Sequence, residues 1–466
     1  LRALLAQGQT PQGVGALARW LAANPREPSR AAAIALQLLE RGADPFGPAP
    51  GGDSALGLAA QLPCLPVLDA LLQRGVDPAQ RDARGQTPLH HAVARGHEAV
   101  IKRLVRHGAP ADARAADGQT PHGAALARGR RDLAEWLDWG PWKLPGRALL
   151  PGDLPAAAMA GDLGAVVRLV ALGLAVDGVD AQGCTALLRA AGGGHLAIVD
   201  HLLGLHADTG LAARTGATPL SAAISMRHAN VVDRLLAAGA DPEQAMPGGV
   251  TPLMLASALG LPDLVSRLLR AGANVAARDA QGLTPLHCAA LFAFNSRERA
   301  RVLALFDTLL LADADAEATS ASEQTPTLLL LGARAEAGAS VDEDVLLAAL
   351  DRLLSEGVSL AHVEHRGLSA LHLAALHGLG RIVERLLREG ANPAARDRLG
   401  RTPHDLALIR GFVDIAALFQ SVRQAEAKPP AEAGADDAAA AVPPPAAPAP
   451  SGVLPSLARL LKPRDQ

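Results

Sequence analysis

The chain has 466 residues, of which 49% are hydrophobic and 20% are charged, so it carries ample material for a buried core. The formal net charge is −3 and aromatic residues make up only 2%. This balance excludes the strongly basic surface of a non-specific nucleic-acid binder, and it removes the aromatic rings on which single-stranded bases stack. We therefore expect no nucleic-acid partner.

The three cysteines show no metal-ligand spacing, which favours reduced thiols at Cys64, Cys184 and Cys288. The longest uncharged run, residues 438–458, contains prolines that forbid a membrane-spanning helix. We expect a cytoplasmic chain. Because the sequence starts at Leu1, a preceding segment could still make the protein secreted, periplasmic or membrane-anchored.

Residues 1–50 are expected to form an N-terminal capping region with one degenerate repeat. Residues 34–45 resemble residues 67–78, which lie 33 positions later, whereas Pro25 and Pro28 break the helical pattern before them. We therefore expect only half a unit here.

From residue 51 onward, a hydroxyl residue followed by Pro or Ala recurs at successive gaps of 33, 33, 65, 33, 33, 33, 41, 44 and 33 residues. The gap of 65 contains one degenerate unit, and the gaps of 41 and 44 contain insertions of 8 and 11 residues. Such a period is typical of a repeat protein. The recurring residues are Ser54, Thr87, Thr120, Thr185, Thr218, Thr251, Thr284, Thr325, Ser369 and Thr402.

Each unit predicts two short helices. Thr87-Pro88 places a capping hydroxyl before a proline that suits the first helical position. Gly96 then ends the first helix in a left-handed conformation. In a later unit, residues 231–236 space apolar side chains three and four apart on the second helix, which Gly239 ends.

Longer matches accompany the period. Residues 82–90 match residues 279–287, and residues 235–242 match residues 386–393. With its Thr-Pro-Leu-His runs and Gly-Ala-Asp turns, the chain resembles the ankyrin-repeat family over residues 32–420. The resemblance implies an all-α solenoid of about 11 to 12 stacked helix-turn-helix units with hairpin loops. The many Arg beside only four Lys indicate a GC-rich, bacterial genome.

The repeats are expected over residues 51–140 and 154–420. Between them, residues 141–153 form a Pro-rich joint, which is either a kink or a boundary between two sub-arrays. Trp136, Trp139 and Trp142 either fill this joint or bind a partner. Insertions are expected near residues 294–301 and 333–344, where solenoids place loops on one face.

Residues 421–466 are rich in Ala and Pro and are expected to form a disordered tail. Near its end, Leu457, Leu460 and Leu461 have helical spacing. They belong either to a frayed end or to a short docking helix.

No catalytic, phosphate-binding or metal motif occurs in the sequence, so we expect neither an enzyme nor a cofactor. His90, His287 and His372 share one repeat position, and the family resemblance implies that this histidine hydrogen-bonds nearby backbone. Residues 362–365 contain two His and one Glu, which is a weak metal-binding pattern, and we expect no metal site.

Ankyrin modules bind through hairpin tips and first helices that line a concave surface. Carried over by position, this predicts an apolar groove between basic edges, suited to a protein segment with acidic ends. Alternatively, Leu291 and Phe292 turn inward beneath the insertion. Met226 occupies the same repeat position as Arg95, near the end of the first helix. The predicted contact residues are Arg95, Arg128, Val250, Leu259, Leu283, Leu291, Phe292, Leu368, His377, Arg401 and Arg410.

The sequence thus predicts a non-catalytic scaffold, expected to be monomeric, that binds a protein partner. The alternative is the regulatory or targeting portion of a larger protein, which a segment before Leu1 could anchor in a membrane. Fold alone does not identify the partner.

Overall fold

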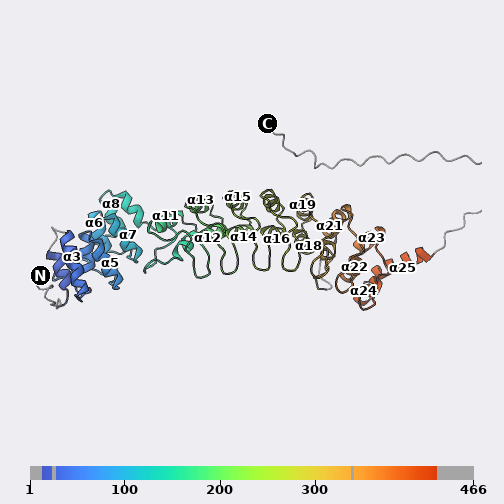
Figure 1. Ribbon diagram of the computed structural model, residues 1–466, viewed down its shortest axis with the longest axis horizontal. Coiled ribbons are helices and arrows are strands. Elements are labelled where there is room, and N and C mark those ends of the chain that lie inside the picture. The colour runs from blue at the N-terminus through green and yellow to red at the C-terminus, as the bar shows by residue number, and fades with distance from the viewer. Residues whose placement is uncertain (1–12, 24–27, 337–340, 428–466) are drawn as a thin grey trace, which may run out of the picture. The chain divides into compact units, whose positions relative to one another are not determined.

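A computed structural model describes residues 13–23, 28–336 and 341–427 (Figure 1). The described residues up to Leu418 form one compact unit, and the end of the last helix belongs to a second. Most of the expected tail, residues 428–466, lies outside the described ranges. The first part of that segment differs from our expectation, because the last helix continues to Ala427.

The described chain is built from helix pairs. The first helix of each repeat unit starts directly after the recurring hydroxyl residue or its equivalent. These first helices are α4 (Ala55–Gln61), α6 (Pro88–Arg95), α8 (Pro121–Ala127), α10 (Asp153–Met159), α12 (Ala186–Gly193), α14 (Pro219–Ser225), α16 (Pro252–Ala258), α18 (Pro285–Asn295), α20 (Pro326–Leu330), α22 (Ala370–His377) and α24 (Pro403–Arg410).

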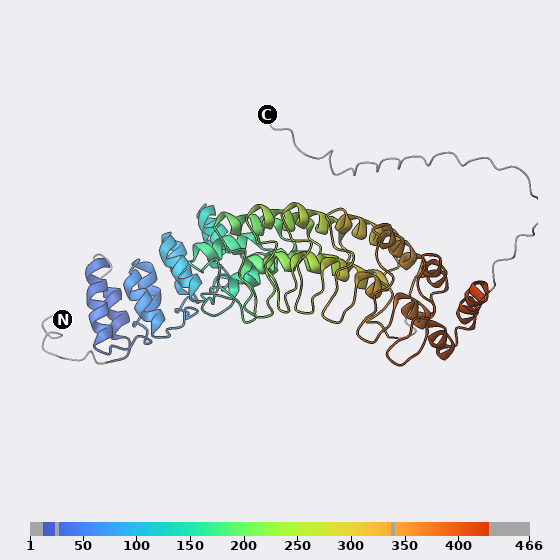
Figure 2. The ribbon, with the colours of Figure 1, turned by 45° about the vertical axis from the view of Figure 1, so that its right-hand side comes forward.

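The second helices return along the first ones and lead into the next hairpin loop. In the middle of the compact unit, the first and second helices form two adjacent rows, and the hairpin loops extend beyond the first helices (Figure 2). The second helices are α5 (Leu65–Gln73), α7 (Glu98–Arg106), α9 (Arg131–Leu137), α11 (Leu163–Ala171), α13 (Leu196–Gly204), α15 (Ala229–Ala237), α17 (Pro262–Arg270), α19 (Arg299–Leu310), α21 (Glu343–Ser355), α23 (Gly380–Arg388) and α25 (Val413–Ala427).

The helix ends carry the capping residues that the sequence predicts. The Thr120 hydroxyl accepts a hydrogen bond from the backbone N–H of Gly123 at the start of α8. Pro121 occupies the first helical position, where its missing N–H removes no intrahelical bond. At the other end of a first helix, Gly194 adopts a φ of 72° and closes α12.

Stacking of neighbouring units buries the apolar faces. Helix α12 packs between α10 and α14, and α16 packs between α14 and α18. Small side chains such as Ala190 and Ala223 are fully buried and allow close approach of the first helices. On the second helices, Leu235 and Leu268 are fully buried. No unit could bury these faces alone, so the core runs continuously along the stack.

The N-terminal region differs from the expected half-unit. Helices α2 (Ala16–Ala23) and α3 (Pro28–Glu40) form a complete pair, which packs on α4 and α5. The indole N–H of Trp20 donates to the carbonyl of Ala31 at 3.2 Å and links the two helices. Pro28 starts α3 rather than breaking a helix, because a proline is tolerated in the first turn.

The Pro-rich joint interrupts the row of first helices. Helix α8 lies beside α6 and α9, whereas α10 lies beside α11 and α12. The segment between them folds back on the earlier unit, where Leu149 N–H donates to Arg106 O at 2.9 Å. Arg147 then holds the buried Asp153 carboxylate through two bonds of 2.9 and 2.8 Å.

The two insertions have different structural consequences. The first lengthens α18 and α19 to 11 and 12 residues. The second follows α20, which has only 5 residues, and precedes α21; residues 337–340 within it lie outside the described ranges. Both units remain in the stack, because α20 packs on α18 and α21 packs on α19. Among the described helices, none has the length and apolarity needed to cross a membrane.

Candidate protein-interaction surface

In several units an aspartate fixes the shape of the hairpin loop. Asp82 accepts the backbone N–H groups of Arg84 and Gln86, both at 2.8 Å. Asp279 and Asp397 close their hairpins in the same way. Side chains of Asp favour such local turns because they bond backbone groups two residues on. The residue before each first helix is therefore held in a defined place.

Backbone hydrogen bonds join consecutive hairpins. Ala116 N–H donates to Arg84 O at 2.9 Å, and Arg398 N–H donates to Arg366 O at 3.0 Å. Equivalent bonds link other middle hairpins, for example from Arg214 N–H to Gln182 O and from Ala280 N–H to Gly248 O, but Pro247 has no N–H to donate at this position. Neighbouring loops thus form a connected surface whose backbone conformation is set before any partner binds.

The periodic histidines cap the first helices, as the resemblance implied. Thr87 N–H donates to His90 Nδ1 at 3.0 Å, and His90 Nε2 donates to Gln119 O in the next unit at 3.1 Å. His287 and His372 make the same pair of contacts. Burial lowers the pKa of all three imidazoles, because it disfavours their charged form.

A second set of histidines, which the sequence analysis missed, joins successive units. His228 lies ten residues after Thr218, and its Nε2 donates to Gly192 O in the preceding unit at 3.1 Å. Its ring covers Gly194, where an added Cβ would come within 2.6 Å of it. His97 and His195 occupy the same repeat position and also bond preceding carbonyls. The shared spacing could have revealed this set.

The predicted basic contact residues are mostly available. Arg95, Arg128 and Arg410 are exposed at or beside the ends of first helices. Arg401 is half-buried and is paired with Asp397, 2.7 Å from its carboxylate. Three of the four predicted basic residues therefore carry guanidinium groups that face solvent.

The predicted apolar contact residues are less accessible. Leu283 and Leu368 are only 5% and 4% exposed, and His377 is buried with its Nε2 donating to Gly332 O. Val250, Leu259, Leu291 and Phe292 are half-buried. The structure thus leaves part of the predicted groove accessible, while its buried members are used in packing the array.

Phe292 lies over the end of the preceding first helix. Its ring covers Gly260, where an added Cβ would come within 2.2 Å of it. The Arg301 guanidinium lies 5.2 Å from the centre of the ring and donates to Leu259 O and Gly260 O. This arrangement resembles the alternative in which the ring turns toward the array.

Further apolar side chains are exposed on or beside the first helices. Met159, Met226 and Ile409 are 57%, 60% and 65% exposed, respectively. Met226 stands in the repeat position already considered, whereas Met159 and Ile409 stand one position earlier. That neighbouring position carries exposed or half-buried residues throughout the array, and counting it could have found them.

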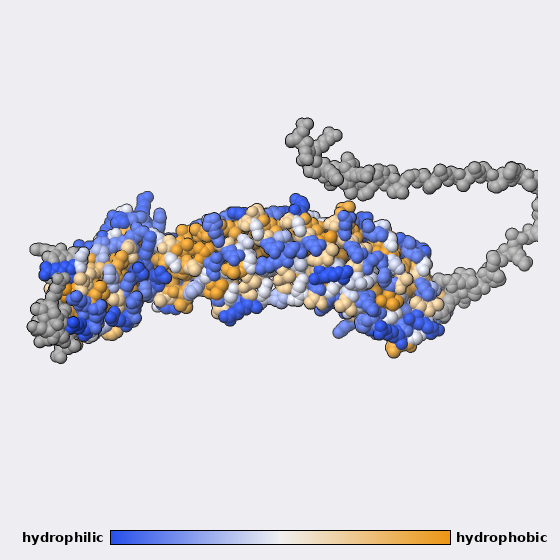
Figure 3. Space-filling model, in the orientation of Figure 1, coloured by the Kyte–Doolittle hydropathy of each residue, from blue (hydrophilic) through white to orange (hydrophobic). Residues whose placement is uncertain are grey.

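A different apolar patch lies on the second helices. Leu163 and Val167 of α11 and Leu196 of α13 are exposed, and apolar surface covers this region in the space-filling view (Figure 3). In α7 and α15 the positions of Leu163 and Val167 carry other residues, Glu98 and Lys102 in α7. This patch on the second helices is the main alternative to the hairpin side as a partner-binding surface.

Tryptophan side chains fill the joint rather than extend from it. Trp139 is buried and its ring centre lies 5.7 Å from that of Trp142. The ammonium of Lys102 lies 4.5 Å from the centre of the Trp136 ring. Beside them, a hollow of about 520 Å³ opens between the joint and the preceding hairpin. These contacts favour the structural interpretation of the cluster.

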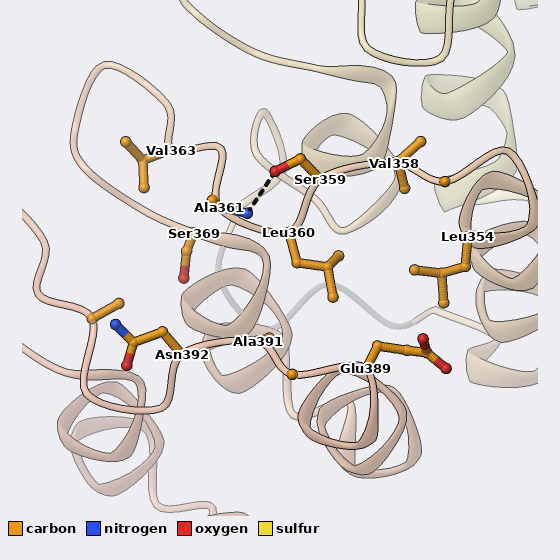
Figure 4. Close-up of a pocket in the computed structure, with 13 residues that line it drawn as sticks. Leu354, Val358, Ser359, Leu360, Ala361, Val363, Ser369, Glu389, Ala391 and Asn392 are labelled. Carbon is orange, nitrogen blue, oxygen red and sulfur yellow. Dashed lines mark hydrogen bonds between the residues drawn. The ribbon is translucent and has the colours of Figure 1, made fainter. Parts of the chain in front are cut away.

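Another hollow, of about 490 Å³, lies between two successive turns near the C-terminal end of the array (Figure 4). Leu360 and Ala391 supply apolar walls, while Ser359 accepts a hydrogen bond from Ala361 N–H at 3.3 Å. Glu389 lines the rim. The residues that line this hollow do not bring catalytic groups together.

The histidines near residue 362 are already engaged with neighbouring side chains. His362 pairs with Glu317, and the buried Glu364 carboxylate accepts from Arg366 and Gln324. His362 and Glu364 of the weak metal-binding pattern therefore contact different side chains. Elsewhere in the described chain, Asp53, Asp82 and His91 converge in a way that the sequence did not suggest.

Comparison with known families agrees with this architecture. A model described as ankyrin repeats (3 copies) matches residues 31–138 and 154–246, and one described as ankyrin repeat matches residues 248–280 and 366–398. The breaks coincide with the joint and with the units that carry insertions. Ankyrin repeats generally mediate protein–protein interactions and are typically non-catalytic. The matched segments cover more than half of the sequence, and the chain belongs to the ankyrin-repeat family.

Proposed function

We propose that this chain is a non-catalytic scaffold that binds a protein partner through its hairpin loops and first helices. One observation carries the proposal. At the repeat position eight residues after the capping hydroxyl, Arg95, Arg128, Met226 and Arg410 have exposed side chains, while Leu259 and Phe292 are half-buried and His377 is buried. The neighbouring Thr, His and Gly positions cap the helices and pack between units, so this position can vary without loss of the fold.

The charge and polarity of this surface favour a particular kind of partner. Arg95 and Arg128 are exposed in the early units, and Arg410 is exposed in the last. Between them lie the half-buried Val250 and Leu259. An extended protein segment with an apolar centre and acidic ends complements this order, because rim charges steer association and apolar contacts supply affinity.

The connected hairpins support binding by a preformed surface. Asp side chains close several of their turns, and backbone hydrogen bonds join most consecutive hairpins. A surface of this kind loses little conformational entropy when it binds. We expect the chain to be a monomer that engages its partner without a large rearrangement.

The test compares capture of partners from a lysate of the source cell by several forms of the chain. The double variant Arg95→Glu, Arg128→Glu and the variant Met226→Glu alter the proposed surface. Arg131→Glu is the matched control, because Arg131 is exposed on α9, only three residues beyond Arg128. Each variant must first unfold at the temperature of the wild type.

We expect a protein that wild type and Arg131→Glu capture equally and that the other variants lose. A protein lost only by Val167→Glu would instead place binding on the second helices. Equal capture by every variant would contradict the proposed surface.

A further inference from the structure

Two units of the array differ in how they neutralise the hairpin aspartate. In the α12 unit, Asp180 pairs with Arg189, nine residues later, at 2.6 Å. In the α6 unit, His91 takes the arginine position and its Nε2 lies 3.0 Å from Asp82 Oδ2. A guanidinium only donates hydrogen bonds, whereas an imidazole nitrogen can also bind a metal ion.

A second carboxylate enters the α6 site from the preceding hairpin. Asp53 offers an oxygen that lies within 4.8 Å of ligand atoms of both Asp82 and His91. Among the described residues, no hydrogen bond or ion pair engages the Asp53 side chain. Two carboxylates that converge on one imidazole repel each other unless a cation lies between them.

The groups behind this cluster hold its ligand atoms in place. Asp82 Oδ1 accepts the N–H groups of Arg84 and Gln86, which leaves Oδ2 directed to His91. The Gln61 amide lies 3.3 Å from His91 Nδ1. The nearer amide atom is the nitrogen Nε2; turning the amide by 180° would place its oxygen there to accept a hydrogen bond from Nδ1–H, which leaves His91 Nε2 free for a metal ion. Such outer contacts orient metal-binding histidines.

The cluster opens into a hollow of about 440 Å³ between the first two hairpins. Arg84, Arg95 and Arg128 also line this hollow. A divalent ion between Asp53 and Asp82 gives a neutral cluster, so the arginines do not face an uncompensated dication. The open side of the ion retains room for water or for an oxyanion that the arginines attract.

We propose that Asp53, Asp82 and His91 form a binding site for a divalent first-row transition metal of the Zn²⁺ class. One imidazole nitrogen and two carboxylate oxygens form a ligand set that such ions accept, with the remaining positions open. The ion replaces the direct contact between Asp82 and His91 and links the first two hairpins. Metal binding does not require the proposed partner, although Arg95 and Arg128 of the proposed partner surface line the same hollow.

The experiment is isothermal titration of the full chain with Zn²⁺ alone. We expect one saturable site whose affinity falls about 10-fold to 100-fold in Gln61→Ala, as for other outer contacts of metal sites. Asp53→Asn and His91→Gln should abolish the site. Asp82→Asn should abolish it too, while its amide oxygen still accepts the two hairpin N–H groups.

Asp180→Asn is the matched control, because it changes the same repeat position where arginine replaces histidine. It should bind Zn²⁺ like the wild type, and all variants should show wild-type melting in the presence of chelator. Absence of saturable Zn²⁺ binding would overturn the proposal. Binding that is unaffected by Asp53→Asn and His91→Gln would also overturn it, since other histidines would then hold the ion.

Discussion

At the scale of single residues, the repeat demands left-handed backbone at fixed positions. Two residues before the capping hydroxyl, Gly282 and Gly367 have φ values of 73° and 78°. Glu323 stands at this position in the α20 unit and has a φ of 58°. A side chain in this conformation is strained, because its Cβ approaches the following carbonyl. Arg227 replaces the glycine that ends other first helices, with a φ of 63°.

We predict that Glu323→Gly stabilises the chain by about 1 kcal/mol, since relief of strain exceeds the added entropy of the unfolded chain. The Glu323 side chain is exposed, so little else is lost. Urea unfolding monitored by circular dichroism measures the change. Gly282→Ala tests the same position in reverse: it should destabilise, and a stabilised Gly282→Ala variant would contradict the argument.

The buried capping histidines predict acid sensitivity. The pKa of His90, His287 and His372 is lowered in the folded chain, so the unfolded chain binds more protons below about pH 6.5. Stability is then fully present above pH 6.5 and falls as the pH drops toward the folded pKa values. The slope reaches at most about 1.4 kcal/mol per pH unit for each histidine.

Free energies of unfolding measured between pH 5 and pH 8 test this expectation. His287→Ser is the matched variant, because Ser221 caps Thr218 in this way without a titrating group. It should lower stability at pH 8 but reduce the loss on acidification. If the loss below pH 6.5 is the same in both chains, the capping histidine is not its source.

At the scale of helices, most boundaries could be predicted and a few could not. Thr-Pro pairs and left-handed glycines place the ends of helices such as α6, because caps depend on local chemistry. The pair α2 and α3 was expected as half a unit, since Pro28 reads as a break when its position in the first turn is unknown. Helix α20 is short because a left-handed glycine, Gly332 with a φ of 89°, follows it two residues earlier than in units such as that of α6.

The candidate surface was harder to predict than the helices. Repeat position alone assigns Leu283 and Leu368 to the groove, but their burial depends on the neighbouring unit. Phe292 covers Gly260 and lies under the Arg301 guanidinium of α19, contacts that repeat position alone does not reveal. The convergence of Asp53, Asp82 and His91 joins two hairpins and a helix, so no local motif marks it.

Core packing within a helix pair gives a further prediction. Leu235 of α15 is fully buried, and Leu235→Ala should destabilise the chain by about 2–5 kcal/mol through lost burial and a residual cavity. Leu236, its half-buried neighbour, provides the matched control, and Leu236→Ala should cost less. Urea denaturation measures both. An equal loss in the two variants would argue against stacking as the main source of stability.

At the scale of the whole compact unit, continuity of stacking decides how cooperatively the array unfolds. In a repeat protein each unit is stabilised chiefly by its neighbours, so a weak interface divides the unfolding transition. The joint supplies such an interface, because α8 and α10 are separated by an extended segment. Leu126 of α8 is 51% exposed, whereas Ala191 and Ile224 are buried at the equivalent position.

We therefore predict that the units before the joint unfold at a lower urea concentration than the units after it. Trp136, Trp139 and Trp142 lie at the joint and Trp20 lies in α2, so tryptophan fluorescence reports the joint and the units before it, while circular dichroism reports all helices. The fluorescence transition should precede the main circular dichroism transition. Arg147→Ala leaves the buried Asp153 carboxylate without its partner and should move the fluorescence midpoint further down than the circular dichroism midpoint. Coincident transitions in the wild type, shifted together by Arg147→Ala, would mean that the clamp between Arg147 and Asp153 couples the two halves into one cooperative unit.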